Sequence, residues 1–160
     1  DVVERTFTKV EPSPPVEPVA NGKGLAFGRH DMVDWDRIPG NVAAMPIASW
    51  GETATVTLPK AIGEHVALRF RGFLDVPATE LWRFALASDD GSKLWIDGEV
   101  VVDNDGLHGT EEKRGARALG KGLHPIEIVW FNRTGGAELS LRWARPGAPF
   151  EAVPASALRH

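Results

Sequence analysis

The sequence contains no cysteine, no long apolar run and no excess of basic residues. Without cysteine, the 160-residue chain can form no disulfide, zinc–thiolate site or thiol nucleophile. The absence of cysteine does not determine the redox compartment, since both extracellular and cytoplasmic proteins can lack it. No apolar stretch approaches the roughly 20 residues that a membrane-spanning helix needs. Asp and Glu (22) outnumber Lys and Arg (18), for a formal charge of −4. This balance argues against nucleic acid and anionic membrane surfaces as partners.

The composition is that of a globular domain preceded by a linker. Apolar residues make up 42% of the chain and charged residues 25%, and 160 residues are enough for one domain with a substantial core. The stretch "EPSPPVEPVANGKG", residues 11–24, is rich in proline, which stiffens a chain into a semi-rigid spacer. We therefore expect residues 1–23 to hold the end of a preceding domain and a linker, and residues 24–160 to form one domain.

The predicted domain consists of short strands. Apolar residues alternate with polar ones in four segments, namely Val66–Arg71, Trp82–Leu86, Ile126–Trp130 and Leu139–Trp143. The pair Asp97-Gly98 tolerates positive φ and predicts a tight hairpin turn. No segment after Gly24 shows a sustained helical period. The pattern indicates an all-β protein, either an antiparallel sandwich or a barrel, and periodicity cannot choose between the two.

Two carboxylates stand side by side at Asp89 and Asp90, directly before Gly91. Adjacent residues of a strand point to opposite faces, so the two side chains could share a cation only if the backbone kinked sharply, for instance through a cis peptide. The alternative is a strand that ends at Ser88, followed by a turn in which the aspartates accept hydrogen bonds from nearby N–H groups. The residues alone leave both interpretations open.

A calcium site would need more ligands than these two. Ca²⁺ takes six to eight oxygen ligands, from carboxylates, amides, backbone carbonyls and water. Asn132, at the end of a strand and before a glycine-rich loop, is the third ligand we expect; otherwise it closes a turn. A second acidic cluster, Asp103 to Asp105, lacks the glutamate of a twelve-residue calcium loop and indicates a turn, with His108 beside it as an ordinary loop histidine.

Catalysis has little support in the sequence. No Gly-x-Ser-x-Gly elbow is present, and the five histidines are scattered along the chain. We expect the chain to be an accessory domain and not an enzyme, with no catalytic residues of its own.

Two long stretches carry a resemblance to a known family. "FALASDDGSKLWIDGEVVVDNDGLHG" and "LGKGLHPIEIVWFNRTGGAELSLRW" resemble the protective-antigen-type (PA fourteen) domain, and the resemblance extends over about residues 24–158. It implies a jelly-roll-like β-sandwich of the kind found in extracellular glycosidases, adhesins, toxins and lectin-like proteins. The domain is accordingly expected outside the cytoplasm, as a secreted, cell-surface or periplasmic module.

The resemblance also implies a site. In sugar-binding members, paired aspartates joined by a cis peptide and a later asparagine hold Ca²⁺, and the ion binds sugar hydroxyls; Asp89, Asp90 and Asn132 match these positions. The loop after Asn132 is short here and carries no aromatic residue, so Arg133 and Thr134 are its expected polar contacts with sugar.

The tryptophans divide into two groups. Trp35 and Trp50 lie in loop-like surroundings, where an exposed indole could stack on a sugar face. Trp82, Trp130 and Trp143 lie in predicted strands and are expected in the core.

The first residues suggest a parent protein. "VVERTFTKVEPSPPV" is similar to the last strand of a small fibronectin-like domain that follows the catalytic barrel in some bacterial β-hexosaminidases. Together the resemblances imply a calcium-dependent carbohydrate-binding module that holds a glycan-active enzyme near polysaccharide or glycoprotein, with glycan and neighbouring domains as its partners. The alternative is a structural or spacer module with no ligand of its own.

Overall fold

The computed structural model describes residues 11–17 and 22–160, so the strand expected within residues 1–10 lies outside the described residues. The described part contains eleven strands and two three-residue 3₁₀ helices, η1 (Val42–Ala44) and η2 (Ala155–Ala157). No helix in it is long and apolar enough to cross a membrane. The strands are β1 (Leu25–Asp31), β2 (Ser49–Thr53), β3 (Val66–Val76), β4 (Glu80–Asp89), β5 (Ser92–Ile96), β6 (Glu99–Asn104), β7 (Glu111–Leu119), β8 (Gly122–Asn132), β9 (Glu138–Ala144), β10 (Glu151–Ala152) and β11 (Leu158–Arg159).

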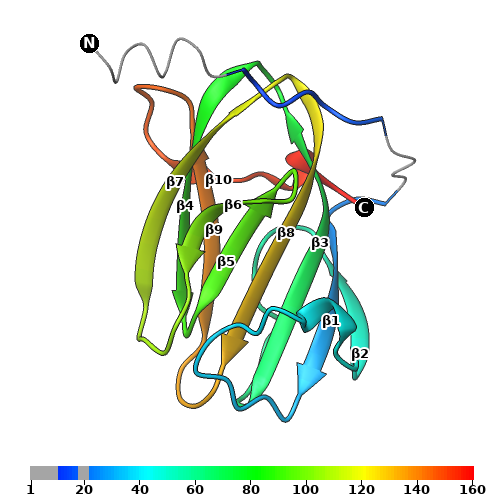
Figure 1. Ribbon diagram of the computed structural model, residues 1–160, viewed down its shortest axis with the longest axis vertical. Helices are drawn as coiled ribbons and strands as arrows, with labels where there is room; N and C mark the ends of the chain where they lie inside the picture. Colours follow the sequence, from blue (N-terminus) through cyan, green and yellow to red (C-terminus); the bar gives the residue numbers. More distant parts are fainter. Residues whose placement is uncertain (1–10, 18–21) are drawn as a thin grey trace.

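The strands pair antiparallel in two sheets that form the layers of a sandwich (Figure 1). The large sheet has the order β2-β1-β3-β8-β5-β6, with β11 also paired to β3. The small sheet has the order β10-β9-β4-β7. The sequence prediction of an all-β fold is confirmed, and the two separate sheets decide for the sandwich over the barrel.

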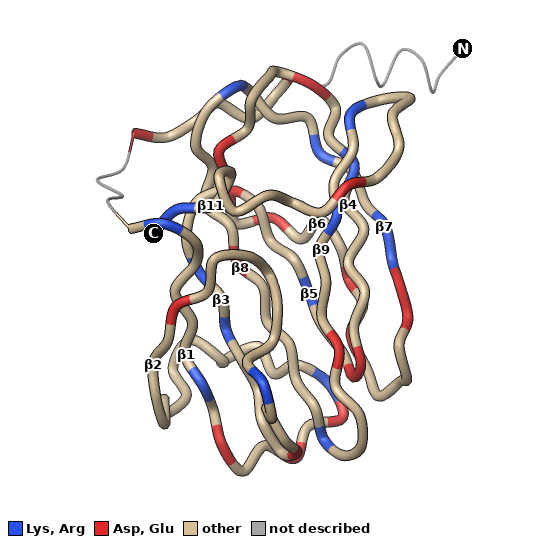
Figure 2. Tube along the Cα trace, turned by 180° about the vertical axis from the view of Figure 1, so that it is seen from behind, with Lys and Arg blue, Asp and Glu red and all other residues tan. Residues whose placement is uncertain are grey.

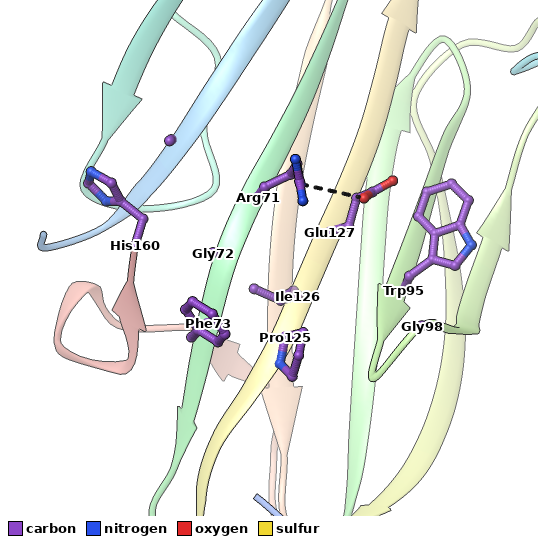
Figure 3. Close-up of a pocket in the computed structure, with 10 residues that line it drawn as sticks. Arg71, Gly72, Phe73, Trp95, Gly98, Pro125, Ile126, Glu127 and His160 are labelled. Atoms are coloured by element: carbon purple, nitrogen blue, oxygen red, sulfur yellow. Dashed lines mark ion pairs between the residues drawn. The ribbon is translucent and has the colours of Figure 1, made fainter. Parts of the chain in front are cut away.

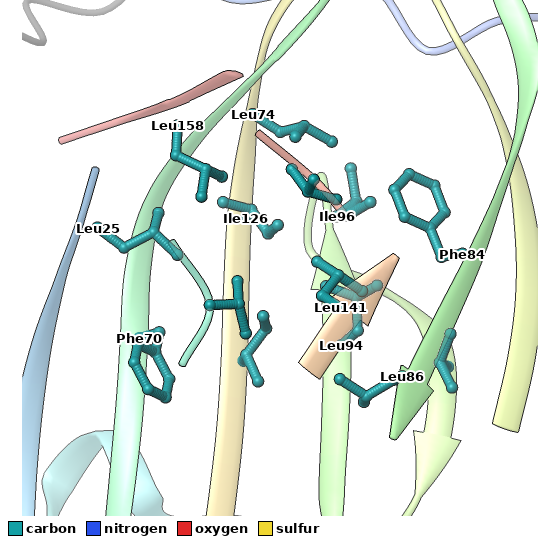
Figure 4. Close-up of a cluster of buried hydrophobic side chains, with 14 of the residues drawn as sticks. Leu25, Phe70, Leu74, Phe84, Leu86, Leu94, Ile96, Ile126, Leu141 and Leu158 are labelled. Atoms are coloured by element: carbon teal, nitrogen blue, oxygen red, sulfur yellow. The ribbon is translucent and has the colours of Figure 1, made fainter. Parts of the chain in front are cut away.

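The core lies between the two sheets (Figure 4). The four alternating segments predicted from the sequence lie in β3, β4, β8 and β9, and in each strand the apolar side chains that alternate with polar ones are buried in this layer. Trp82, Trp130 and Trp143 are buried as expected, and the rings of Trp82 and Trp143 stack with centroids 4.6 Å apart. Burial of this apolar face is what selects the register of each strand.

The β5–β6 hairpin turns where the sequence predicts it. Asp97 and Gly98 both have positive φ, 55° and 79°, as a tight hairpin turn requires. With one bulge between Leu94 and Trp95, the hairpin returns the chain so that Asn104 lies opposite Ser92. The segment after β6 therefore comes back to the place where β5 begins.

Both ends of the described chain pack on the sandwich. Ser13 and Val16 form bridges with Leu119 and Leu123, on either side of the turn between β7 and β8. Near the C-terminus, Val153 and Leu158 are buried in the core.

Charged positions are distributed over the whole molecule. Figure 2 shows Lys and Arg interspersed with Asp and Glu along both sheets. This distribution agrees with the absence of a basic excess in the sequence.

Candidate functional site

The Asp89-Asp90-Gly91 segment is the corner at which the chain leaves the small sheet and enters the large one. β4 ends at Asp89 and β5 begins at Ser92, and the peptide bond between Asp89 and Asp90 is cis. The corner is attached to β8 by backbone bonds: Asp90 N–H donates to Phe131 O (3.1 Å), and Phe131 N–H donates to Gly91 O (3.1 Å). In addition, the indole N–H of Trp130 donates to Asp89 O (2.9 Å). The two aspartates are thus held against the end of β8.

Gly91 leaves the space that this arrangement needs. A Cβ at this position would lie 2.7 Å from Gly106 N, Gly106 O and a ring carbon of Phe131. Such distances are far shorter than a carbon atom allows, so only glycine lets the loop after β6 approach the corner this closely. The third letter of "DDG" is therefore required by packing.

The two carboxylates differ in their surroundings. Asp90 is buried, with 7% of its surface exposed, and its Oδ2 accepts a hydrogen bond from Arg133 N–H (2.8 Å). Asp89 is half-buried. Burial raises the pKa of Asp89, as do a hydrogen bond with the Asp90 side chain and the negative charges of Asp90 and Glu138, while His108 acts in the opposite direction. The pair thus concentrates negative charge that a cation would neutralise.

Asn132 supplies an unpartnered oxygen beside the pair. It is fully buried, and its Nδ2 donates to Gly63 O (2.8 Å) and Gly135 O (3.2 Å), which fixes the orientation of the amide. Its Oδ1 is buried and has no hydrogen-bond partner in the described part of the chain. A buried acceptor without a partner costs about 1–3 kcal/mol, so this oxygen is available to bond a ligand. Hereafter Asp89, Asp90 and Asn132 are called the aspartate corner.

The loop after Asn132 covers one side of the aspartate corner and is held from outside. The Arg133 guanidinium pairs with Asp34 (2.9 Å) and Asp36 (2.6 Å). Gly135 N–H donates to a Glu64 carboxylate oxygen (2.6 Å). Thr134 is exposed at the tip of this loop. Arg133 is thus attached to the corner through its backbone N–H, which bonds to Asp90, and Thr134 follows it in the chain; their contact with sugar stays a prediction.

The two tryptophans proposed for sugar stacking differ in their distance from the corner. Trp35 packs edge-on against Phe131, with ring centroids 5.7 Å apart, and covers a small apolar cluster on the outer face of the large sheet. Trp50 is 71% exposed, but it lies on β2, which is separated from β8 by β1 and β3. The structure therefore brings Asp89, Asp90, Asn132 and Arg133 together, places Trp35 against the neighbouring Phe131, and leaves Trp50 outside this group.

His108 belongs to the surroundings of the site, although the sequence indicated only a loop histidine. Its ring nitrogens lie 2.8 Å from Gly109 O and 2.8 Å from Asn104 O. Burial lowers the pKa of His108, but these two carbonyl acceptors and the charges of Glu111 and Asp90 outweigh it and raise the pKa overall. The signal was available: the predicted hairpin at Asp97-Gly98 returns the "DNDGLHG" segment to "DDG".

The aspartate corner fits a hard cation only if an amide oxygen and backbone carbonyls take part. The described residues contain no group of three or more His, Cys, Asp or Glu side chains placed to hold a metal ion. The corner has two carboxylates, with the unpartnered Asn132 Oδ1 on the neighbouring strand. Oxygen-only sets of this kind suit Ca²⁺ and not zinc or copper. The chemistry of the donors is therefore compatible with calcium.

Comparison with known proteins gives consistent matches. The family model described as "PA14 domain" matches residues 47–157. Anti-sigma-I factor RsgI3 of Acetivibrio thermocellus is 27% identical over 111 residues, which are 68% of this chain and 17% of that protein. A β-hexosaminidase of Porphyromonas gingivalis is 28% identical over 82 residues, 51% of this chain and 10% of that protein. The chain thus spans less than a fifth of either relative.

A solved structure shares the fold. The "PA14 sugar-binding domain from RTX adhesin" superposes with a TM-score of 0.76 over 88% of this chain and 99% of that one, at 16% sequence identity. The likeness therefore extends over nearly the whole of a separate domain.

Proposed function

The chain belongs to the PA14 domain family, and from that premise we propose that it is a non-catalytic carbohydrate-binding module whose aspartate corner holds a calcium ion. The observation that carries the proposal is the buried, unpartnered Oδ1 of Asn132, a residue whose two chain neighbours, Phe131 and Arg133, are hydrogen-bonded to Asp90. Such an oxygen is costly in an empty fold and useful in a metal site. The sugar-binding structure of the same fold supports the assignment of the ligand class.

In the proposed site, this chain's residues would have two roles, binding the ion and bonding the sugar hydroxyls. Asp89, Asp90 and Asn132 would hold the ion, and a bound calcium would supply open coordination positions for two sugar hydroxyls. The carboxylates accept hydrogen bonds from the same hydroxyls, because each hydroxyl is a donor as well as an acceptor. Arg133 is held by Asp34 and Asp36, so its position at the rim is fixed before a ligand arrives.

We further propose that the module serves a larger extracellular protein that acts on or recognises glycans. Two relatives that carry a similar segment, a β-hexosaminidase and an anti-sigma factor, are many times longer than this chain, which spans 10% and 17% of them. A module that binds glycan raises the local concentration of its parent at a polysaccharide surface without adding contacts to the parent's own site.

The first test is thermal unfolding in EDTA and across a calcium titration. A site at one hundred times its Kd would stabilise the domain by about 2.7 kcal/mol, which raises the Tm by roughly 5–10 °C. The variant Asp90→Asn preserves shape and removes one ligand charge, so it should lose most of this rise. The matched control is Asp103→Asn, at an exposed carboxylate of β6, and it should respond as the parent chain does.

Two outcomes would contradict the proposal. If calcium leaves the Tm unchanged, the aspartate corner is not a calcium site under those conditions and a structural role for the module takes the lead. If both variants respond to calcium equally, the ion binds elsewhere on the acidic surface. With a calcium response in hand, a glycan array probed with the parent chain and Asp90→Asn tests the sugar.

A further inference from the structure

The outer face of the large sheet is covered over only part of its area. A small apolar cluster of Val33, Ala67 and Phe131, with Trp35 and Ile38 packed against it, covers the part near the aspartate corner. Beyond this cluster, toward the opposite end of β3 and β8, the face is hollowed into a cavity of about 570 Å³. Pockets of about 300–1,000 Å³ are typical of small-molecule sites.

The cavity is organised by strand register. Ala26, Arg71, Glu127 and Trp95 are consecutive partners in one row across β1, β3, β8 and β5. Side chains in one such row point to the same face of a sheet, and Figure 3 shows Arg71, Glu127 and Trp95 side by side on three neighbouring strands. The remaining lining residues are Gly72, Phe73, Gly98, Pro125, Ile126 and His160. This cavity is called the outer groove below.

The polar groups of the outer groove balance one another. The Glu127 carboxylate lies 4.0 Å from the guanidinium of Arg71, its neighbour in the row. It lies 2.9 Å from the guanidinium of Arg69, which is two residues from Arg71 on β3. The Arg71 side chain is 63% exposed and Glu127 is 29% exposed, so both present hydrogen-bonding groups to a ligand. The groove thus offers donors and an acceptor at close range without a dominant charge.

The backbone beneath the outer groove is already paired. β3 bonds to β1 and β8, β8 to β3 and β5, and β5 to β8 and β6. A peptide that binds by strand addition needs an unpaired sheet edge, which these interior strands do not present. A ligand on this face is therefore recognised by side chains alone, through an indole surface and a nearly neutral set of donors and acceptors.

We propose that the outer groove is a second, metal-independent binding site for a neutral oligosaccharide. A sugar ring has an apolar C–H face, which Trp95 would cover, and a rim of hydroxyls, each a donor and an acceptor, which Arg71 and Glu127 would bond. Trp95 and Arg71 are two strand spacings apart, about 10 Å, which spans more than one sugar ring. The proposal shares with the proposed function only the ligand class, carbohydrate, and it needs no ion.

The test is a ¹⁵N-resolved NMR titration of the chain in excess EDTA, read at the tryptophan indole N–H signals. The probes are five neutral hexasaccharides: cellohexaose, chitohexaose, xylohexaose, mannohexaose and laminarihexaose. We expect at least one to move the Trp95 signal, which is assigned by its loss in Trp95→Ala, in a saturable way with a Kd of about 0.1–1 mM. If none moves it, the proposal is wrong.

Variants locate the binding. Trp95→Ala lacks the indole signal, so its titration is read at the backbone amide signals, and the variant should bind at least about tenfold more weakly. The matched control, Trp50→Ala, removes an exposed indole on β2 that does not line the groove, and it should bind as the parent chain does. Arg71→Ala, at an exposed side chain whose loss spares the fold, should weaken binding several-fold. Loss of binding in Trp50→Ala with full binding in Trp95→Ala would overturn the proposal.

The proposals for the two sites can be rejected independently of each other. Asp90→Asn should leave the EDTA-resistant shift of Trp95 unchanged, because the aspartate corner plays no part in it. If sugar binds only with calcium and moves no Trp95 signal, the proposed function stands and the outer groove is not a site. If Trp95 responds in EDTA while calcium has no effect on the Tm, the reverse holds.

Discussion

The aspartate corner and the outer groove differ in what holds their residues in place. At the corner, the aspartates are fixed by backbone bonds to β8, by the Trp130 indole and by the loop after Asn132. In the outer groove, Arg71, Glu127 and Trp95 are neighbours in one row of paired strands, and their side chains lie on the outer face of the sheet. A change at the corner should therefore cost more stability than a comparable change in the groove.

The largest expected effect tests this contrast with two glycines. Gly91→Ala places a Cβ against the Gly106 backbone and Phe131 at 2.7 Å, so we expect the free energy of unfolding to fall by about 2–4 kcal/mol. Gly98, which lines the outer groove, has open space around it and a φ of +79°, so Gly98→Ala should cost only about 1 kcal/mol. Urea denaturation of both variants measures the difference. Equal losses would mean that the corner is no more tightly packed than the groove.

A smaller effect is expected where the corner loses a side chain without a clash. Asn132→Ala removes the donors to Gly63 O and Gly135 O, and we expect a loss of about 1–3 kcal/mol in EDTA together with loss of the calcium response. Its counterpart in the groove, Arg71→Ala, removes only an exposed ion pair and should change stability by about 0.5 kcal/mol or less. Urea denaturation in EDTA is the measurement. A stable Asn132→Ala domain that still responds to calcium would contradict the role of this residue.

The smallest effect concerns pH and separates the two regions electrostatically. The pKa of His108 is raised in the folded state, so its stabilising contribution is fully present below the ordinary histidine value of 6.5 and is lost as the pH rises through the folded value. As the pH rises across this window in EDTA, the Tm of the parent chain should therefore decrease relative to the Tm of His108→Gln. Removal of Arg71 from the groove should leave the same slope intact, because arginine stays charged throughout. Parallel Tm profiles for the parent chain and His108→Gln would show that the His108 charge does not contribute.

The strands could be predicted because their signal is local. In β3, β4, β8 and β9 the alternation of apolar and polar residues is visible in the sequence, and the hairpin at Asp97-Gly98 depends on two adjacent residues. The same local signal located the trio of the aspartate corner only with the help of a family resemblance. The packing of Gly106 against Gly91 and the placement of His108 depend on where β6 returns; the hairpin signal predicts that return but not the contacts made there.

By itself, the sequence determined an all-β fold with a buried layer of alternating apolar residues and the hairpin turn at Asp97-Gly98, while the cation site at Asp89, Asp90 and Asn132 stays a prediction. Only the tertiary structure decided that there are two sheets, that Trp50 lies away from the corner, and that Arg71, Glu127 and Trp95 form one row. The physical reason is register: a one-residue slip moves every side chain of a strand to the other face, and partners 32 or 56 positions apart are fixed by the packing of the whole core.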